Sequence, residues 1–151
     1  MEQITDTWDI NNRVNFYLLE AIEEAHFPDI SASRGRTVGE QLAHIHNVRL
    51  MWLKASAPDL LERLIKIEKD NITKDILRKE LIKSGEAISK MIGRGLEEGR
   101  IKGFKPHPVG FLGYIISHES HHRGQIVLSL KQSGHPLDKK VLFGLWEWGT
   151  R

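Results

Sequence analysis

Four segments of this 151-residue chain carry apolar side chains at the three- and four-residue intervals typical of an amphipathic α-helix. They run from about Thr5 to Glu24, from about Val38 to Ala55, from Thr73 through Met91, and from about Val109 to Gln132. No segment shows sustained period-two alternation, so no sheet is predicted. Four such segments joined by short loops favour an all-α protein, a four-helix bundle in which residues 1–151 form one domain.

Local signals place several ends of these helices. Thr37 and Glu40 form a Thr-x-x-Glu capping box, so the second helix should start at about Val38. Pro58 suits the first turn of a short extra helix that ends near Lys66. Ser133 and Gly134 should close the last long helix.

The tail is unusually aromatic, with the sequence Leu142-Phe143-Gly144-Leu145-Trp146-Glu147-Trp148. We interpret it as a segment that folds back onto the bundle. A dimer contact is the sharper alternative, because tryptophan is favoured at protein interfaces.

The composition excludes several classes of function. The net charge is +2, from 22 basic and 20 acidic residues, so no concentrated basic face for nucleic acid is expected. No apolar run approaches the roughly 20 residues of a membrane span, and the acidic start Met1–Asp6 is not a secretory signal, so a cytoplasmic location is expected. Because there is no cysteine, any metal must be held by histidine and carboxylate.

A block of three histidines lies in the last long helix, in the segment His118-Glu119-Ser120-His121-His122. His118 and His122 are four residues apart, on one helix face and in line with apolar positions, so the two imidazoles can share a divalent metal. A third ligand must come from another helix. His44 and His46 are two apart and project from nearly opposite faces, so only one can point at the site.

Spacing alone leaves two alternatives open at this block. His121 is also one turn from His118, so those two could form the pair. The segment also spells His-Glu-x-x-His, the signature of zinc peptidases, in which Glu119 would be the general base and His135 or Glu147 a downstream ligand. No strand is predicted that could align a peptide substrate. For His26, His107 and His135, which lie in loop-like sequence, surface or capping roles are expected.

Several motifs together resemble the DinB-like family of metal-dependent helical-bundle proteins. They are Leu42-Ala43-His44-Ile45 followed by Trp52-Leu53, the block from His118 to Ile126, the lead-in Pro108–Leu112 and the ending Leu145–Trp148. The resemblance covers most of the chain. It implies an up-down-down-up four-helix bundle, often a homodimer, in which three histidines hold one divalent ion. By position these ligands are His44, His118 and His122; the ion would be nickel or zinc in the first place, with iron or manganese as alternatives.

The resemblance also leads to a functional hypothesis. Three neutral ligands leave a metal with its full charge and an open position, the arrangement of a catalytic site. The wider superfamily includes transferases and isomerases that depend on low-molecular-weight thiols, so a metal-dependent enzyme acting on a small molecule is expected, first a thiol transferase and next a hydrolase. The alternative is a non-catalytic bundle that binds metal for stability or sensing. An open site lined by Tyr114, Arg123 or Gln125 would favour the enzyme, although Arg123 and Gln125 could equally serve the structure.

Overall fold

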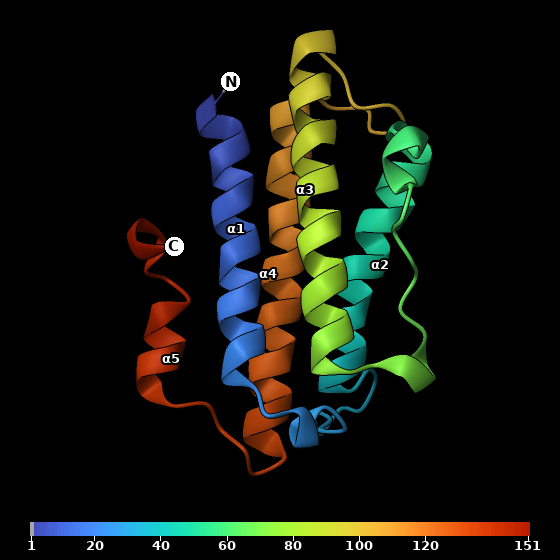
Figure 1. Ribbon diagram of the computed structural model, residues 1–151. Helices are drawn as coiled ribbons and strands as arrows, with labels where there is room; N and C mark the ends of the chain where they lie inside the picture. The colour runs from blue at the N-terminus through green and yellow to red at the C-terminus, as the bar shows by residue number, and fades with distance from the viewer. Residues whose placement is uncertain (1) are drawn as a thin grey trace.

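The computed structural model describes residues 2–151, which form helices and the turns that connect them (Figure 1). The long helices are α1 (Glu2–Ala21), α2 (Val38–Ser56), α3 (Lys74–Glu98) and α4 (Pro108–Gln132). The short ones are α5 (Lys139–Gly144) and the 3₁₀ turns η1 (Glu24–His26), η2 (Pro58–Leu61), η3 (Lys69–Asn71) and η4 (Trp148–Thr150). Within residues 2–151 no strand forms, and one isolated bridge pairs Ile101 with Phe104. The predicted all-α class is confirmed.

The four long helices form a bundle with the predicted up-down-down-up order. In Figure 1, α1 and α4 run downwards from their first residues, whereas α2 and α3 run upwards. Helix α2 packs against α3 and α4, and α1 packs against the same two helices. Because α2 and α3 are parallel, the chain between them, residues 57–73, travels the length of the bundle.

The capping box predicted at the start of α2 is present, and α3 has a side-chain cap as well. The Thr37 side chain accepts a hydrogen bond from the Glu40 amide at 3.2 Å, and a Glu40 carboxylate oxygen accepts from the Thr37 amide at 2.9 Å. Thr73 caps α3 through the Ile76 amide. His107 caps α4, which agrees with the capping role expected for it.

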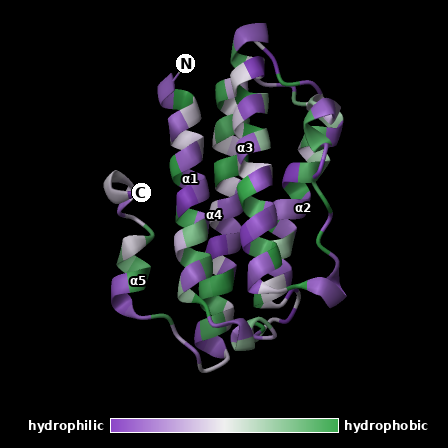
Figure 2. Cartoon of the chain, in the orientation of Figure 1, coloured by the Kyte–Doolittle hydropathy of each residue, from purple (hydrophilic) through white to green (hydrophobic). Residues whose placement is uncertain are grey.

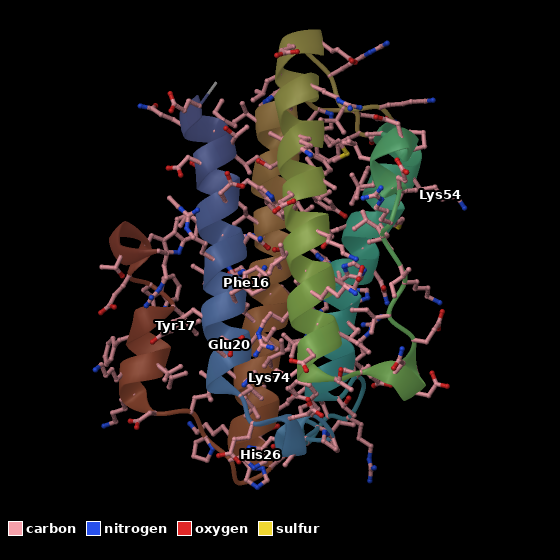
Figure 3. All side chains as sticks on the ribbon, viewed as in Figure 1. Phe16, Tyr17, Glu20, His26, Lys54 and Lys74 are labelled. Atoms are coloured by element: carbon pink, nitrogen blue, oxygen red, sulfur yellow. The ribbon has the colours of Figure 1, made fainter. Side chains whose placement is uncertain are left out.

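Helix α1 begins and ends three residues earlier than the predicted Thr5–Glu24. The reason at its end is a contact from α3, since the Lys74 ammonium donates hydrogen bonds to the carbonyls of Glu20 and Ile22 (Figure 3). Carbonyls in the last turn of a helix lack intrahelical partners, so this lysine ends the helix by satisfying them.

The short helix predicted from Pro58 to Lys66 is wrong in its length. The chain makes one 3₁₀ turn, Pro58–Leu61, and then leaves the helical conformation. Arg63 has φ 66°, in the left-handed region, where a right-handed helix cannot continue.

The bundle core has two apolar layers with a buried polar layer between them. The lower layer includes Leu18, Leu42, Ile45, Leu77, Leu81, Ile126 and Leu130, and the upper one Trp8, Leu53, Ile88, Met91, Phe111 and Ile115. The buried polar residues that lie between them along the helices are Asn11, Asn15, His46, Arg49, Ser84, Glu119, His122 and Arg123. Figure 2 shows this change along α4, where hydrophilic residues occupy the middle of the helix.

The aromatic tail folds back onto the bundle, as interpreted from the sequence. Helix α5 lies beside α1, and Tyr17 points from α1 towards it (Figure 3). The Arg151 guanidinium lies 3.7 Å from the centre of the Tyr17 ring and donates hydrogen bonds to the Gly144 carbonyl. None of the helices in residues 2–151 combines the length and apolar character needed to cross a membrane.

Candidate metal centre

Three histidines meet where α2 packs against α4. His44 comes from α2, and His118 and His122 come from α4. One ring nitrogen from each lies within 4.8 Å of the others, and the ring centres are 4.6 to 5.3 Å apart. The structure therefore brings together the three residues expected as ligands, in a group that could hold a metal ion.

The surroundings keep these imidazoles neutral. Burial, reinforced by the neighbouring rings of His118 and His44, lowers the pKa of His122 to about 3. Burial and the charge of Arg36 lower the pKa of His44 to about 4, and the pKa of His118 is also lowered, chiefly by burial. Neutral imidazole is the form that binds divalent metals, so the site carries available lone pairs at neutral pH.

Gln41 fixes the tautomer and orientation of His122. The Nδ1 of His122 lies 2.5 Å from the Gln41 Oε1, while the Gln41 Nε2 donates to the Gln125 Oε1 at 2.8 Å. The amide oxygen of Gln41 therefore accepts a hydrogen bond from the Nδ1–H of His122, and the Nε2 of His122 carries a free lone pair. Metal-binding histidines are commonly held in this way through their other ring nitrogen.

The donor set fits a divalent cation. The Nε2 atoms of His118 and His122 face each other at 3.2 Å, and the buried Nδ1 of His118 has no hydrogen-bond partner among residues 2–151. Whichever tautomer His118 adopts, at least one of these buried nitrogens stays unsatisfied, an arrangement that is rare without a bound ligand or water. A cation bound between the rings would accept the facing Nε2 lone pairs.

His121 lies outside the group. It is exposed, and its Nε2 accepts a hydrogen bond from the Gln125 amide at 2.8 Å. Gln125 thus links His121 to Gln41, and through Gln41 it supports the candidate metal centre. The alternative pair of His118 with His121 is not the one that converges with His44.

His46 points away from the centre, as the two-residue spacing predicts. It is fully buried, with Nδ1 3.0 Å from the Ser84 hydroxyl and Nε2 2.7 Å from the Ile65 carbonyl. Both ring nitrogens are engaged, so His46 ties α2 to α3 and to the long connection between them.

Glu119 does not occupy the place of a peptidase base. Its carboxylate accepts hydrogen bonds from Arg49, Asn11 and Asn15 at 2.7 Å, and the side chain is 1% exposed. Burial raises the pKa of the Glu119 carboxyl, but the charge and hydrogen bonds of Arg49 outweigh it and the pKa lies below its ordinary value. A general base must reach its substrate proton, so the peptidase hypothesis loses the residue on which it depends.

A cavity of about 630 Å³ adjoins His44. Its charged lining residues are Arg36, Glu40, Lys66, Glu68 and Lys69. Neither Tyr114 nor Arg123, considered from the sequence, lines it. Tyr114 packs against Trp52, Phe104 and Phe111, and Arg123 lies in the buried polar layer. The polar surface beside the histidines thus comes from α2 and from the loops around it.

A second group of possible ligands lies at the base of the bundle. His26, Asp29 and His135 also have ligand atoms within 4.8 Å of one another. However, the two rings stack at 3.7 Å with an interplanar angle of 9°, and Nδ1 of His135 lies 2.7 Å from Asp29. Lone pairs lie in the ring plane, so those of stacked rings run parallel and do not converge. This agrees with the surface roles expected for His26 and His135.

Sequence reasoning missed Gln41 and Arg49, which support the ligand-bearing helices. Gln41 lies three residues before His44, one turn away on the same side of α2. A polar residue one turn from a candidate ligand is the available signal. Arg49 carries no comparable signal, because its partner Glu119 is 70 positions away in sequence.

Comparison with protein families gives one result. The model of the DinB family matches residues 1–139. No curated protein and no solved structure matches the chain.

Proposed function

The chain belongs to the DinB family, and we propose that it binds one divalent ion through His44, His118 and His122 and uses it in chemistry on a small molecule. The observation that carries this proposal is the convergence of three neutral imidazoles, one of which, that of His118, has a buried ring nitrogen without a hydrogen-bond partner among residues 2–151. An all-imidazole set suits nickel or zinc, with iron or manganese as alternatives.

Thiol transfer is the reaction that these surroundings support best. A bound divalent ion would lower the pKa of a thiol or a water molecule that coordinates it. In the cavity beside His44, Lys66 pairs with Glu68 and Lys69 with Glu40, so the surplus positive charge of its lining comes from Arg36. That charge would attract an anionic substrate such as a low-molecular-weight thiol with a carboxylate group. Gln41 would hold His122 in the required orientation. Hydrolysis is the nearest alternative, because the same site could activate water.

A non-catalytic role is the second candidate. The three imidazoles come from two helices, so a bound ion would cross-link α2 to α4 and stabilise the bundle. In that case metal should raise the melting temperature without any turnover of a small molecule.

Family resemblance also leads us to propose a homodimer. Phe143 and Trp146 in the tail are 69% and 82% exposed, and they offer apolar surface for a second copy.

The test combines metal analysis with an activity assay. Purified protein, reconstituted with nickel or zinc, would be assayed for loss of thiol groups from cysteine-containing small molecules in the presence of an epoxide or an alkyl halide. Faster loss with the metal-loaded protein than with the apo protein or the H44A variant supports the transferase. Metal binding without turnover supports the non-catalytic role. Absence of metal after reconstitution would contradict both the transferase proposal and the non-catalytic proposal.

A further inference from the structure

A second cavity lies between α4 and the tail, away from the histidines. Its volume is about 290 Å³, and its lining residues are Ile116, Ser120, Arg123, Gly124, Val127, Leu142, Leu145, Trp146 and Trp148. Ser120 and Gly124 are each two residues from His122, so they face the opposite side of α4 from that ligand. The cavity and the candidate metal centre are therefore separate sites.

Arg123 brings an unpaired cation to this cavity. It is 7% exposed, and its Nη1 donates hydrogen bonds to the amide oxygens of Asn11 and Asn15 at 2.9 and 2.7 Å. Its Nε and Nη2 atoms have no hydrogen-bond partner among residues 2–151, and no carboxylate in that range forms an ion pair with it. The neighbouring Glu119 is already bound by Arg49.

The charge balance of the polar layer leaves one positive charge uncompensated. Arg49 and Arg123 contribute two cations, and Glu119 contributes the one anion among them. An unpaired buried cation is costly to maintain, so its retention beside a cavity points to a ligand that supplies the missing anion. One surplus charge matches a carboxylate monoanion better than a phosphate dianion.

The walls of the cavity specify the rest of the ligand. Two tryptophans and four aliphatic residues line the cavity together with Arg123, so the ligand needs a flat aromatic or short aliphatic body. Gly124 contributes space, since a side chain added there would meet no atom within 4 Å. The tail residues of the wall, from Leu142 to Trp148, lie beyond the part of the chain that matches the family.

We propose that this cavity binds a small aryl- or alkyl-carboxylate, with its carboxylate on Arg123 and its body between the tail and α4. The free Nε and Nη2 of Arg123 are adjacent donors, which can grip both oxygens of a carboxylate. The site would take such a ligand whether or not the histidines hold a metal.

The test uses hydrocinnamate and its uncharged isostere, hydrocinnamamide, with binding measured by calorimetry and by the change in intrinsic tryptophan fluorescence, to which Trp146 and Trp148 of the cavity contribute. The carboxylate should bind about tenfold or more tightly than the amide, because a hydrogen-bonded charge pair replaces a neutral contact. Equal affinity of the two compounds, or absence of binding by both, would overturn the proposal.

Three variants locate the site. Gly124→Leu fills the cavity and should weaken hydrocinnamate roughly tenfold, whereas Gly113→Leu, at another open glycine of α4 outside the cavity, should leave it unchanged. Arg123→Gln should abolish the preference for the carboxylate. If Arg123→Gln does not fold, the proposal is tested by the comparison of hydrocinnamate with hydrocinnamamide and by the Gly124→Leu variant. His44→Ala should bind hydrocinnamate normally, and loss of binding in that variant would place the carboxylate at the metal centre and overturn the proposal.

Discussion

Arg49 donates two hydrogen bonds to Glu119 at the centre of the bundle, from Nε to Oε1 at 2.7 Å and from Nη2 to Oε2 at 3.1 Å. The Arg49 side chain is 0% exposed and that of Glu119 1%. Glu119 follows His118 directly on α4, and Arg49 lies on α2, the helix that carries His44. The buried pair therefore fixes how the two helices with the candidate ligands face each other.

Removal of the charge of Glu119 should destabilise the protein strongly. The Glu119→Gln variant leaves the Arg49 cation buried without its carboxylate, a change that costs about 3–5 kcal/mol. Urea unfolding followed by circular dichroism measures the difference. Glu97→Gln, at an exposed position of α3, is the matched control and should leave the free energy of unfolding unchanged. Equal stability of the two variants would contradict this role of the pair.

Much of the fold follows from patterns that a single sequence displays. The spacing of apolar residues predicts four helices, and the Thr37 and Thr73 caps locate two of their starts. The helix ends that differ from the prediction depend on distant contacts or on backbone conformation. Lys74 ends α1 through a contact from a different helix, and the left-handed backbone conformation of Arg63 stops the helical turn after Pro58. Neither effect is visible in the local spacing of apolar residues.

The candidate site is partly predictable for a similar reason. His118 and His122 lie on one helix, where a four-residue spacing defines their relation. Which of His44 and His46 lies beside His118 and His122 depends on the face of α2 that meets α4. In the structure His44 joins that group, and His46 lies against Ser84. The partners of Glu119 could not be predicted, because they come from two other helices that are distant in sequence.

Replacement of any one ligand should reduce metal content sharply. His44→Ala, His118→Ala and His122→Ala each remove one of three imidazoles, and affinity depends on all of them. Elemental analysis after dialysis against nickel or zinc measures occupancy. His135→Ala, in the second histidine group, is the matched control and should retain the metal. Metal retained by His44→Ala and lost from His135→Ala would show that the assignment is wrong.

His46→Ala needs a separate expectation. It should still bind metal, because His46 faces away from the centre. Its stability should fall, because the Ser84 hydroxyl and the Ile65 carbonyl lose a buried partner. A thermal melt separates the two effects, and normal stability with lost metal would contradict the prediction.

Gln41 should tune the affinity of the centre without being a ligand. Gln41→Leu removes the acceptor of the His122 Nδ1 proton, and loss of such a partner typically lowers metal affinity about 10–100-fold. Gln125→Leu breaks only the next link, between Gln41 and His121, and should have a smaller effect. Competition with a chelator gives both affinities. An equal affinity for Gln41→Leu and the unmodified protein would exclude this role.

The tail should mediate the proposed homodimer. Phe143→Ser removes an exposed aromatic ring outside the carboxylate cavity, so the dimer should weaken. Met51→Ser, at a 54% exposed position of α2, is the matched control. Light scattering at micromolar concentration measures the mass, and a monomeric mass for the unmodified protein would contradict the dimer.

The pH dependence of metal binding should differ from that of free histidine. An imidazole with the ordinary pKa of 6.5 begins to lose its metal to protons near that pH. In the folded chain the pKa of His44 is about 4 and that of His122 about 3, because burial and nearby charges disfavour the imidazolium. Protons therefore compete with the metal at these two residues only well below pH 6.5.

The same shifts give the sign of the stability change without metal. Unfolded His44 binds a proton as the pH falls through 6.5, whereas the folded residue does so only near pH 4. The unfolded state thus holds more protons between these values, and the apo protein should lose stability as the pH falls through this window. Metal titrations should accordingly give a nearly constant affinity from about pH 8 down through about pH 6.5, and a fall only well below that value. A hexahistidine peptide, whose imidazoles are solvated, should show the fall near pH 6.5 under the same conditions. If the protein and the peptide lose metal at the same pH, the imidazoles of the centre are not shielded in the way that the structure indicates.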